Sequence, residues 1–147
     1  VAKASNASLW VMGGRKLSLL STWLPTNSLI MTLGVVGHEQ KVRHLAASKG
    51  LLFPIRWEEP FGLVIIEAMA CGSPVIAFNR GAVNEIIHNG TTGFVVESTQ
   101  EMSAMVDRLV DIDRAACRRH VEENFTIART ASELKCLYAQ VLEGNSW

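Results

Sequence analysis

The stretch EEPFGLVIIEAMACGSPVIAF, from Glu58 to Phe78, carries the clearest structural signal in the chain. Between Pro60 and Ala70 the only charged residue is Glu67, and a second carboxylate, Glu59, stands just before this apolar run. Burial of an ionised carboxylate is costly unless another group compensates its charge. Glu67 therefore either has a partner within the protein or faces a cleft in which a ligand is its partner.

Length and composition favour one globular domain spanning 1–147. The chain has 147 residues, of which 48% are hydrophobic, so it can bury a substantial core. Its formal net charge is zero and it has no basic block, which argues against a nucleic-acid partner. Its three cysteines are odd in number and lack the spacing of metal ligands, so we expect reduced thiols in a cytoplasmic protein.

Short apolar runs alternate with helical patterns along the sequence. The runs are apolar throughout, as in strands buried on both faces of a parallel sheet, and they lie at 9–12, 30–33, 51–54, 75–78 and 93–96. Helical spacing and start and stop signals predict helices at 39–48, 61–71, 82–88, 98–111, 114–124 and 127–142. We predict an α/β, Rossmann-like layered domain with one parallel sheet of five strands and helices on both faces. The central motif covers 54–96, and the C-terminal helices cover 98–142.

The helix expected at 61–71 offers an anion site. Its first backbone N–H groups have no partner within the helix and point into the crevice at the carboxyl end of the preceding strand. Together with the helix dipole they suit a phosphate. Gly62 lets a ligand approach the backbone without meeting a Cβ atom.

The two glutamates add hydroxyl-binding groups to this crevice. Side chains of a helix lean toward its N-terminus, so Glu67 can reach back to the crevice, and Glu59 stands on the loop at its rim. Carboxylates for hydroxyls and amides for phosphates together suit a sugar nucleotide. The alternative is that a buried arginine or a backbone amide holds Glu67 in a purely structural role.

The run EEPFGLVIIEAMACGSPVIA, with the later GAVNEIIHNGTTGFVV from Gly81 to Val96, resembles the donor site of retaining glycosyltransferases with the GT-B fold. The mark of that family is two glutamates separated by seven residues, here Glu59 and Glu67, followed by A-M-A-x-G-x-P-V-I-A. The resemblance is strong from about Leu29 to Val96 and rests on pattern alone in the C-terminal helices.

The resemblance implies roles for particular residues. Glu67 would bind the ribose hydroxyls of a nucleotide-diphosphate sugar, such as a UDP- or GDP-sugar, and Glu59 would be the catalytic-site carboxylate that contacts the donor sugar. Val36 would border the base. The sugar and diphosphate would be held by backbone amides, namely those of Phe61, Gly62, Leu63 and Val64. Family members need neither a cofactor nor protein metal ligands for this chemistry.

The sequence also departs from the family. The Gly-Arg and Lys-Gly pair that neutralises the diphosphate in family members is not placed here, and the stretch from Gly13 to Lys16 is a weak substitute. The chain begins at Val1, so we expect it to be part of a longer protein whose N-terminal, acceptor-binding domain lies outside it. On this reading the isolated chain transfers no sugar. A non-catalytic nucleotide-binding module and another GT-B enzyme, such as a sugar-nucleotide epimerase, stay open as alternatives.

Two sets of arginines are further candidates. Arg80 follows a strand near the crevice and is a candidate for binding an anion. Arg114, Arg118 and Arg119 suggest either a peripheral membrane contact or a solvated helix face.

Overall fold

In the part of the chain that the structure describes, five short parallel strands form the centre. The computed structural model describes residues 1–13 and 28–144. Within them the strands are β1 (Leu9–Met12), β2 (Ile30–Gly34), β3 (Leu51–Phe53), β4 (Val75–Phe78) and β5 (Gly93–Val96). β1 pairs with β2, and β3, β4 and β5 form a second sheet in that order. Val75 lies between Leu51 and Gly93 in this second sheet, and Leu9 lies opposite Ile30 in the first.

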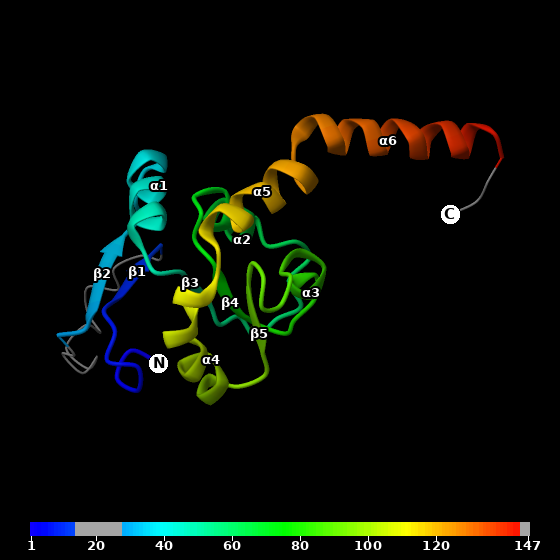
Figure 1. The fold of residues 1–147 in the computed structure, drawn as a ribbon. Helices are drawn as coiled ribbons and strands as arrows, with labels where there is room; N and C mark the ends of the chain where they lie inside the picture. Colours follow the sequence, from blue (N-terminus) through cyan, green and yellow to red (C-terminus); the bar gives the residue numbers. More distant parts are fainter. Residues whose placement is uncertain (14–27, 145–147) are drawn as a thin grey trace.

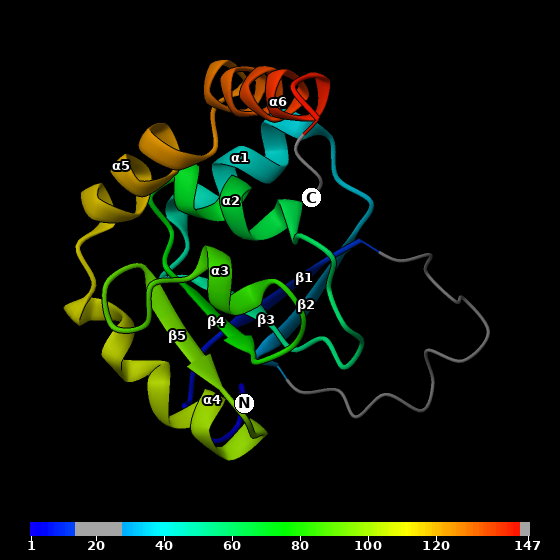
Figure 2. The same cartoon turned by 90° about the vertical axis from the view of Figure 1, so that its right-hand side faces the viewer.

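Helices cover both sides of these strands and continue beyond them. Their bounds are α1 (His38–Ala47), α2 (Leu63–Ala70), α3 (Val83–Ile86), α4 (Thr99–Met105), the 3₁₀ helix η2 (Asp107–Asp111), α5 (Arg114–Asn124) and α6 (Ile127–Leu142). α1 and α2 lie on one side of the strands and α4 lies on the other (Figures 1 and 2). α6 extends away from the rest of the molecule (Figure 1) and buries none of its residues.

The core lies between α2 and the strand β4. All four residues of β4 are buried, because this strand has a neighbour on each edge and helices above and below. Ile65 and Met69, four residues apart on α2, are fully buried, as is Ile76 of β4. A helix that is apolar on nearly every side is buried, as the sequence pattern predicts.

The predicted fold class is confirmed, and one feature of the prediction is wrong. The strands β1, β4 and β5 have the predicted bounds, and all strand pairs are parallel. The expected single sheet is instead two sheets, because no backbone hydrogen bond joins β1 to β3 among the described residues. Strand runs in a sequence predict which segments are extended, but not whether two of them come within bonding distance.

The helix predicted at 98–111 is also divided. Its start is confirmed: the Ser98 hydroxyl accepts a hydrogen bond from the Glu101 amide at 3.2 Å, as the capping-box spacing predicts. The α-helix ends at Met105, and the chain tightens into η2 before Ile112. Leu109 of η2 is buried, so packing of this turn against the core selects the tighter geometry over a continuous helix.

Candidate functional site at the start of helix α2

The entry of α2 is set by a glycine in the left-handed conformation. Gly62 has φ 89° and ψ 58°, which no right-handed helix continues, so α2 begins at Leu63 rather than at the predicted Phe61. The Ile65 amide donates to the Gly62 carbonyl at 2.8 Å. Within the described residues no hydrogen bond uses the four preceding amides, those of Phe61, Gly62, Leu63 and Val64. These are the amides that, by the family resemblance, would hold the sugar and the diphosphate.

The loop that carries Glu59 is held against the loop that follows β4. The Ala82 amide donates to the Glu59 carbonyl at 2.9 Å, and the Gly81 amide donates to a Glu58 carboxylate oxygen at 2.5 Å. Gly81 has φ 57°, and a Cβ atom there would collide with the backbone of Glu59. The Glu59 side chain is half-buried and accepts a hydrogen bond from the Trp57 indole at 3.0 Å. The position of this carboxylate therefore depends on both loops.

Glu67 has a protein partner and is still open to solvent. The Lys41 ammonium on α1 lies 2.6 Å from its carboxylate, with side-chain exposures of 29% for Lys41 and 38% for Glu67. The structural alternative expected a buried arginine or a backbone amide as the partner of Glu67. The partner in the structure is instead a partly exposed lysine. An ion pair this exposed contributes about 0–1 kcal/mol to stability. The interaction of the Glu67 carboxylate with Lys41 is therefore weak.

The thiol of Cys71 lies one helical turn beyond Glu67. Burial raises the pKa of the Cys71 thiol, and the negative charge of Glu67 raises that pKa further. Both effects favour the neutral thiol. Cys71, at the C-terminal end of α2, is thus a poor nucleophile.

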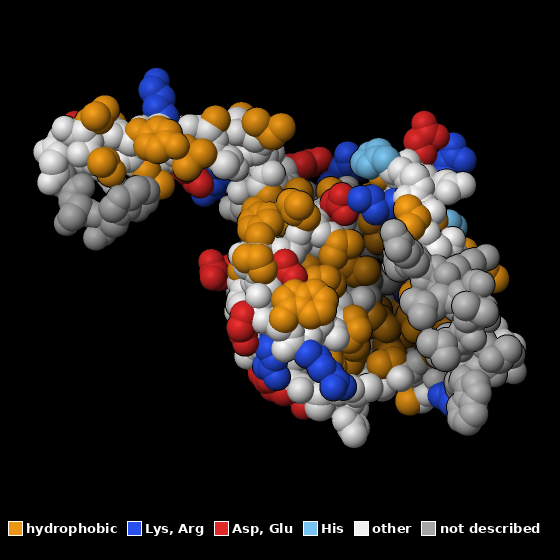
Figure 3. Space-filling model, turned by 180° about the vertical axis from the view of Figure 1, so that it is seen from behind, with side chains coloured by type: hydrophobic (Ala, Val, Ile, Leu, Met, Phe, Trp, Pro, Cys, Tyr) orange, Lys and Arg blue, Asp and Glu red, His pale blue; other side chains and the backbone are white. Residues whose placement is uncertain are grey.

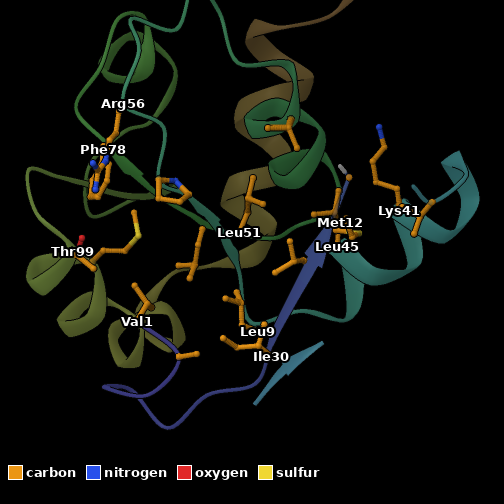
Figure 4. Close-up of a pocket in the computed structure, with 18 of the residues that line it drawn as sticks. Val1, Leu9, Met12, Ile30, Lys41, Leu45, Leu51, Arg56, Phe78 and Thr99 are labelled. Atoms are coloured by element: carbon orange, nitrogen blue, oxygen red, sulfur yellow. The ribbon is translucent and has the colours of Figure 1, made fainter. Parts of the chain in front are cut away.

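An open cavity of about 810 Å³ adjoins this region (Figure 4). Lys41 lines one side of the cavity and Arg56 and Phe78 the other, with Leu51 between them. Other lining residues come from several elements and include Val1, Leu9, Met12, Val36, Leu45, Val64, Thr99 and Met102. Lys41 connects this cavity with Glu67.

The predicted site residues divide into two groups. Val36 and Val64 line the cavity, whereas the remaining five lie outside its lining: Glu59, Phe61, Gly62, Leu63 and Glu67. Phe61 and Leu63 are exposed, and the Phe61 ring meets the ring of Phe125 edge to face at 6.0 Å between centroids. The structure thus forms a rim of carboxylates and amides beside an apolar cavity.

Lys41 and Trp57 are the site neighbours that sequence reasoning missed. The signal for Lys41 is that it precedes Leu45, which faces the core, by four residues on the same helix. Trp57 stands two residues before Glu59, the spacing that puts two side chains on the same side of an extended loop. Neither partner follows from spacing alone, because each contact also depends on how the loops and helices meet.

The candidate arginines have protein partners. Arg80 pairs with Glu97 at 3.6 Å. Arg114 donates to the carbonyls of Ala46 and Ser48 at the end of α1. Arg118 and Arg119 pair with Glu122 and Asp113 within and next to α5. The proposed substitute at Gly13 to Lys16 lies outside the described residues from Gly14 onward.

Two kinds of feature are absent from the described residues. Among residues 1–13 and 28–144, no group of three or more histidine, cysteine, aspartate or glutamate side chains is placed to hold a metal ion. In the same part of the chain, no helix combines the length and the apolar character that crossing a membrane requires.

Comparison with known proteins identifies the family. The model of the family "Glycosyl transferases group 1" matches residues 1–112. The chain belongs to the group 1 glycosyltransferases. Two curated relatives are N-acetyl-alpha-D-glucosaminyl L-malate synthase of Bacillus anthracis and alpha-D-kanosaminyltransferase of Streptomyces kanamyceticus. Each is 30% identical over 118 residues, covering 73% and 74% of this chain and 30% of the relative.

Solved structures share the fold of this group 1 glycosyltransferase chain. AviGT4, a glycosyltransferase of avilamycin A biosynthesis, matches 99% of this chain and 47% of its own with a TM-score of 0.79 at 22% identity. Sucrose-phosphate synthase from Thermosynechococcus elongatus matches 81% of this chain and 32% of its own with a TM-score of 0.63 at 27% identity. The chain spans less than a third of the length of the curated relatives named above and less than half of these structures.

Proposed function

We propose that the chain is the donor-binding part of a retaining glycosyltransferase that uses a nucleotide-diphosphate sugar. Glu67 binds the ribose hydroxyls, and Glu59 contacts the donor sugar at the reacting centre. The diphosphate lies against the amides of the α2 entry, and Val36 borders the base. The observation that carries this proposal is the run of four amides at Gly62 that have no hydrogen-bond partner among the described residues, flanked by two partly exposed carboxylates.

The chemistry needs a stabilised leaving group. As the bond from the sugar to the diphosphate breaks, negative charge grows on the diphosphate oxygens. Amides already aimed at that position stabilise this charge without reorganising, which is the usual source of large rate effects. The N-terminal end of the α2 dipole acts in the same direction.

The ion pair between Glu67 and Lys41 is compatible with ligand binding at the Glu67 carboxylate. The ion pair is exposed and contributes little to stability, so ribose hydroxyls can share the carboxylate at small cost. The Lys41 ammonium then stays at the cavity wall, where an anionic ligand can use its charge.

Acceptor binding and transfer need more polypeptide than this chain provides. We propose that an N-terminal domain of the same protein holds the acceptor, and that transfer retains the configuration of the sugar. We place the protein in the cytoplasm because its three cysteines are free, as expected in a reducing compartment.

A non-catalytic nucleotide-binding module is the second candidate. The observation that favours it is that Lys41 and Arg80, two cations beside the crevice, each already pair with a carboxylate. If these two cations stay paired, the isolated chain should bind nucleotide sugars weakly and transfer nothing.

Calorimetry on the 147-residue chain tests the proposal. UDP-glucose is the first ligand, because the HepE protein of Anabaena, which shares this fold, was solved in complex with it. We expect a weak heat signal for UDP- or GDP-sugars that Glu67→Gln reduces and the matched Glu133→Gln on α6 does not. Absence of binding to every nucleotide sugar, or equal loss in both variants, contradicts the proposal. Tight binding together with transfer to an added acceptor contradicts the inactivity of the isolated chain.

A further inference from the structure

A series of ring contacts connects the start of α2 with α5. The Phe61 ring meets the Phe125 ring at 6.0 Å between centroids, and the Phe125 ring meets the His120 ring at 5.4 Å. Both contacts are edge to face, an arrangement that aromatic pairs prefer. The His88 ring lies 4.2 Å from the His120 ring. We call these four residues the ring chain.

His120 is the fixed member of the ring chain. It is buried, with Nε2 2.9 Å from the Ile86 carbonyl oxygen and Nδ1 3.2 Å from the side-chain nitrogen of Asn124. A carbonyl oxygen only accepts hydrogen bonds, so Nε2 donates to Ile86 and Nδ1 accepts from Asn124. Both ring nitrogens are thus satisfied. The His120 ring cannot rotate without losing two hydrogen bonds in a buried site, and such a loss is costly.

Phe125 connects the ring chain to the hydrophobic core. It is half-buried and packs against the core at the end of α5, a helix that itself packs against α2. α6 begins two residues later, at Ile127, and buries none of its residues. Figure 3 shows hydrophobic side chains exposed along α6. The support for the Phe125 ring therefore comes from α5 and the core rather than from α6.

Phe61 depends on this support. Its side chain is 39% exposed and lies outside the core, and within the described residues its ring contact is with Phe125. The next residue, Gly62, adopts positive and negative φ about equally well, so its own chemistry does not select the observed 89°. The Ile65 amide holds the carbonyl of Gly62 on one side. On the other side, the contact of the Phe61 ring with Phe125 restricts the backbone.

We propose that Phe125 is a positioning residue for the amides at the α2 entry. The proposal rests on the proposed function, because it takes these amides as the site of the diphosphate and the sugar. With the Phe61 ring held against Phe125, the peptide groups on both sides of Phe61 keep one orientation. Without that ring contact, Gly62 is free to change φ, and the amides lose the fixed direction that stabilises a leaving group. Phe125 contacts no reacting group and acts through Phe61.

NMR relaxation of the ligand-free, 147-residue chain tests the positioning directly. Phe125→Leu keeps an apolar side chain and removes the ring, whereas Phe125→Tyr keeps the ring. We expect the backbone order parameters of Gly62 and Leu63 to fall from about 0.85 to below about 0.6 in Phe125→Leu and to stay high in Phe125→Tyr. Val121→Ala is the matched control, because Val121 is also half-buried, belongs to α5 and packs against the core. A rigid Met69 amide in every variant shows that α2 is still folded.

Binding of two ligands separates positioning from a general structural role. We expect Phe125→Leu to weaken UDP-glucose binding by roughly threefold to tenfold, the equilibrium factor that corresponds to one aromatic pair. Binding of uridine should not change, because uridine lacks the diphosphate and sugar that the entry amides would hold. Phe125→Tyr should bind both ligands as the unchanged chain does.

The outcomes for this proposal and for the proposed function are distinct. Unchanged order parameters at Gly62 and Leu63 in Phe125→Leu, or an equal fall in Val121→Ala, overturn the positioning role. Equal weakening of uridine and UDP-glucose overturns it as well. If Glu67→Gln weakens UDP-glucose binding and Phe125→Leu does not, the proposed function stands and the positioning role is wrong. If the unchanged chain binds no nucleotide sugar, the proposed function is contradicted, and the positioning role, which rests on it, falls too.

Discussion

The Lys41 ammonium on α1 and the Glu67 carboxylate on α2 lie 2.6 Å apart at the border of the cavity. This contact joins two helices that follow strands of different sheets: α1 follows β2, and α2 follows β3. A carboxylate that looks out of place in an apolar run is thus both a link between helices and a group available to a ligand.

Replacing Glu67 distinguishes these two roles. We expect Glu67→Gln to lower the free energy of unfolding by no more than about 1 kcal/mol, because the pair is exposed. Nucleotide-sugar binding should weaken by about 1–3 kcal/mol, the range for losing a charged hydrogen bond. Thermal melts with and without UDP-glucose measure both effects. Glu133→Gln, which removes a 2.7 Å ion pair with Arg129 on α6, is the matched control. A stability loss of about 3–5 kcal/mol in ligand-free Glu67→Gln would show a structural role instead.

Gly62→Ala should weaken both stability and ligand binding. The left-handed conformation costs a residue with a Cβ atom about 1–2 kcal/mol, and this Cβ would also lie 2.9 Å from the Ile65 side chain. Gly90→Ala is the control, because Gly90 has φ 80° and open space around its Cβ position. Chemical denaturation should therefore show a larger loss for Gly62→Ala. Equal losses in the two variants would mean that crowding at the α2 entry is unimportant.

Arg114 should stabilise the fold more than its neighbour Arg118. Its guanidinium donates to Ser48 and Ala46 at 2.8 and 2.7 Å, so it bonds carbonyls at the end of α1 that the helix leaves unpaired. We expect Arg114→Gln to cost about 1–2 kcal/mol of unfolding free energy. Arg118→Gln breaks only an exposed pair with Glu122 and should cost less than about 0.5 kcal/mol. Urea denaturation of both variants measures the difference, and an equal cost would contradict it.

Acid should reduce stability partly through Asp113. Hydrogen bonds from the Ala115 amide and from Arg119 lower the pKa of the Asp113 carboxyl below its ordinary value of 3.8. A lowered folded-state pKa adds stability above the unfolded-state value, and this stability is lost as the pH falls through the folded-state pKa. Unfolding of Asp113→Asn, followed from pH 6 down to pH 2, should show a shallower decline than the unchanged chain. If the free energy of unfolding falls equally steeply with pH in both proteins, another carboxyl causes the loss of stability in acid.

The sequence predicts local structure well and long-range contacts poorly. The runs at 75–78 and 93–96 match β4 and β5 because they are continuously apolar and their bounds are set by nearby turns. The division into two sheets escaped prediction, since it depends on the distance between β1 and β3 rather than on either sequence. Lys41 escaped for the same reason: its partner Glu67 is 26 residues away in the chain.

The hydrogen bond from the Trp57 indole to Glu59 couples the fluorescence of this tryptophan to the surroundings of the carboxylate. The indole is 62% exposed, so its emission should respond to changes in solvent and charge at the neighbouring carboxylate. A sugar that takes Glu59 as a hydrogen-bond acceptor would displace the indole and shift its fluorescence. If Glu59 contacts a sugar as proposed, the part of the emission of the four tryptophans that changes on binding reports occupancy of the crevice without an added label.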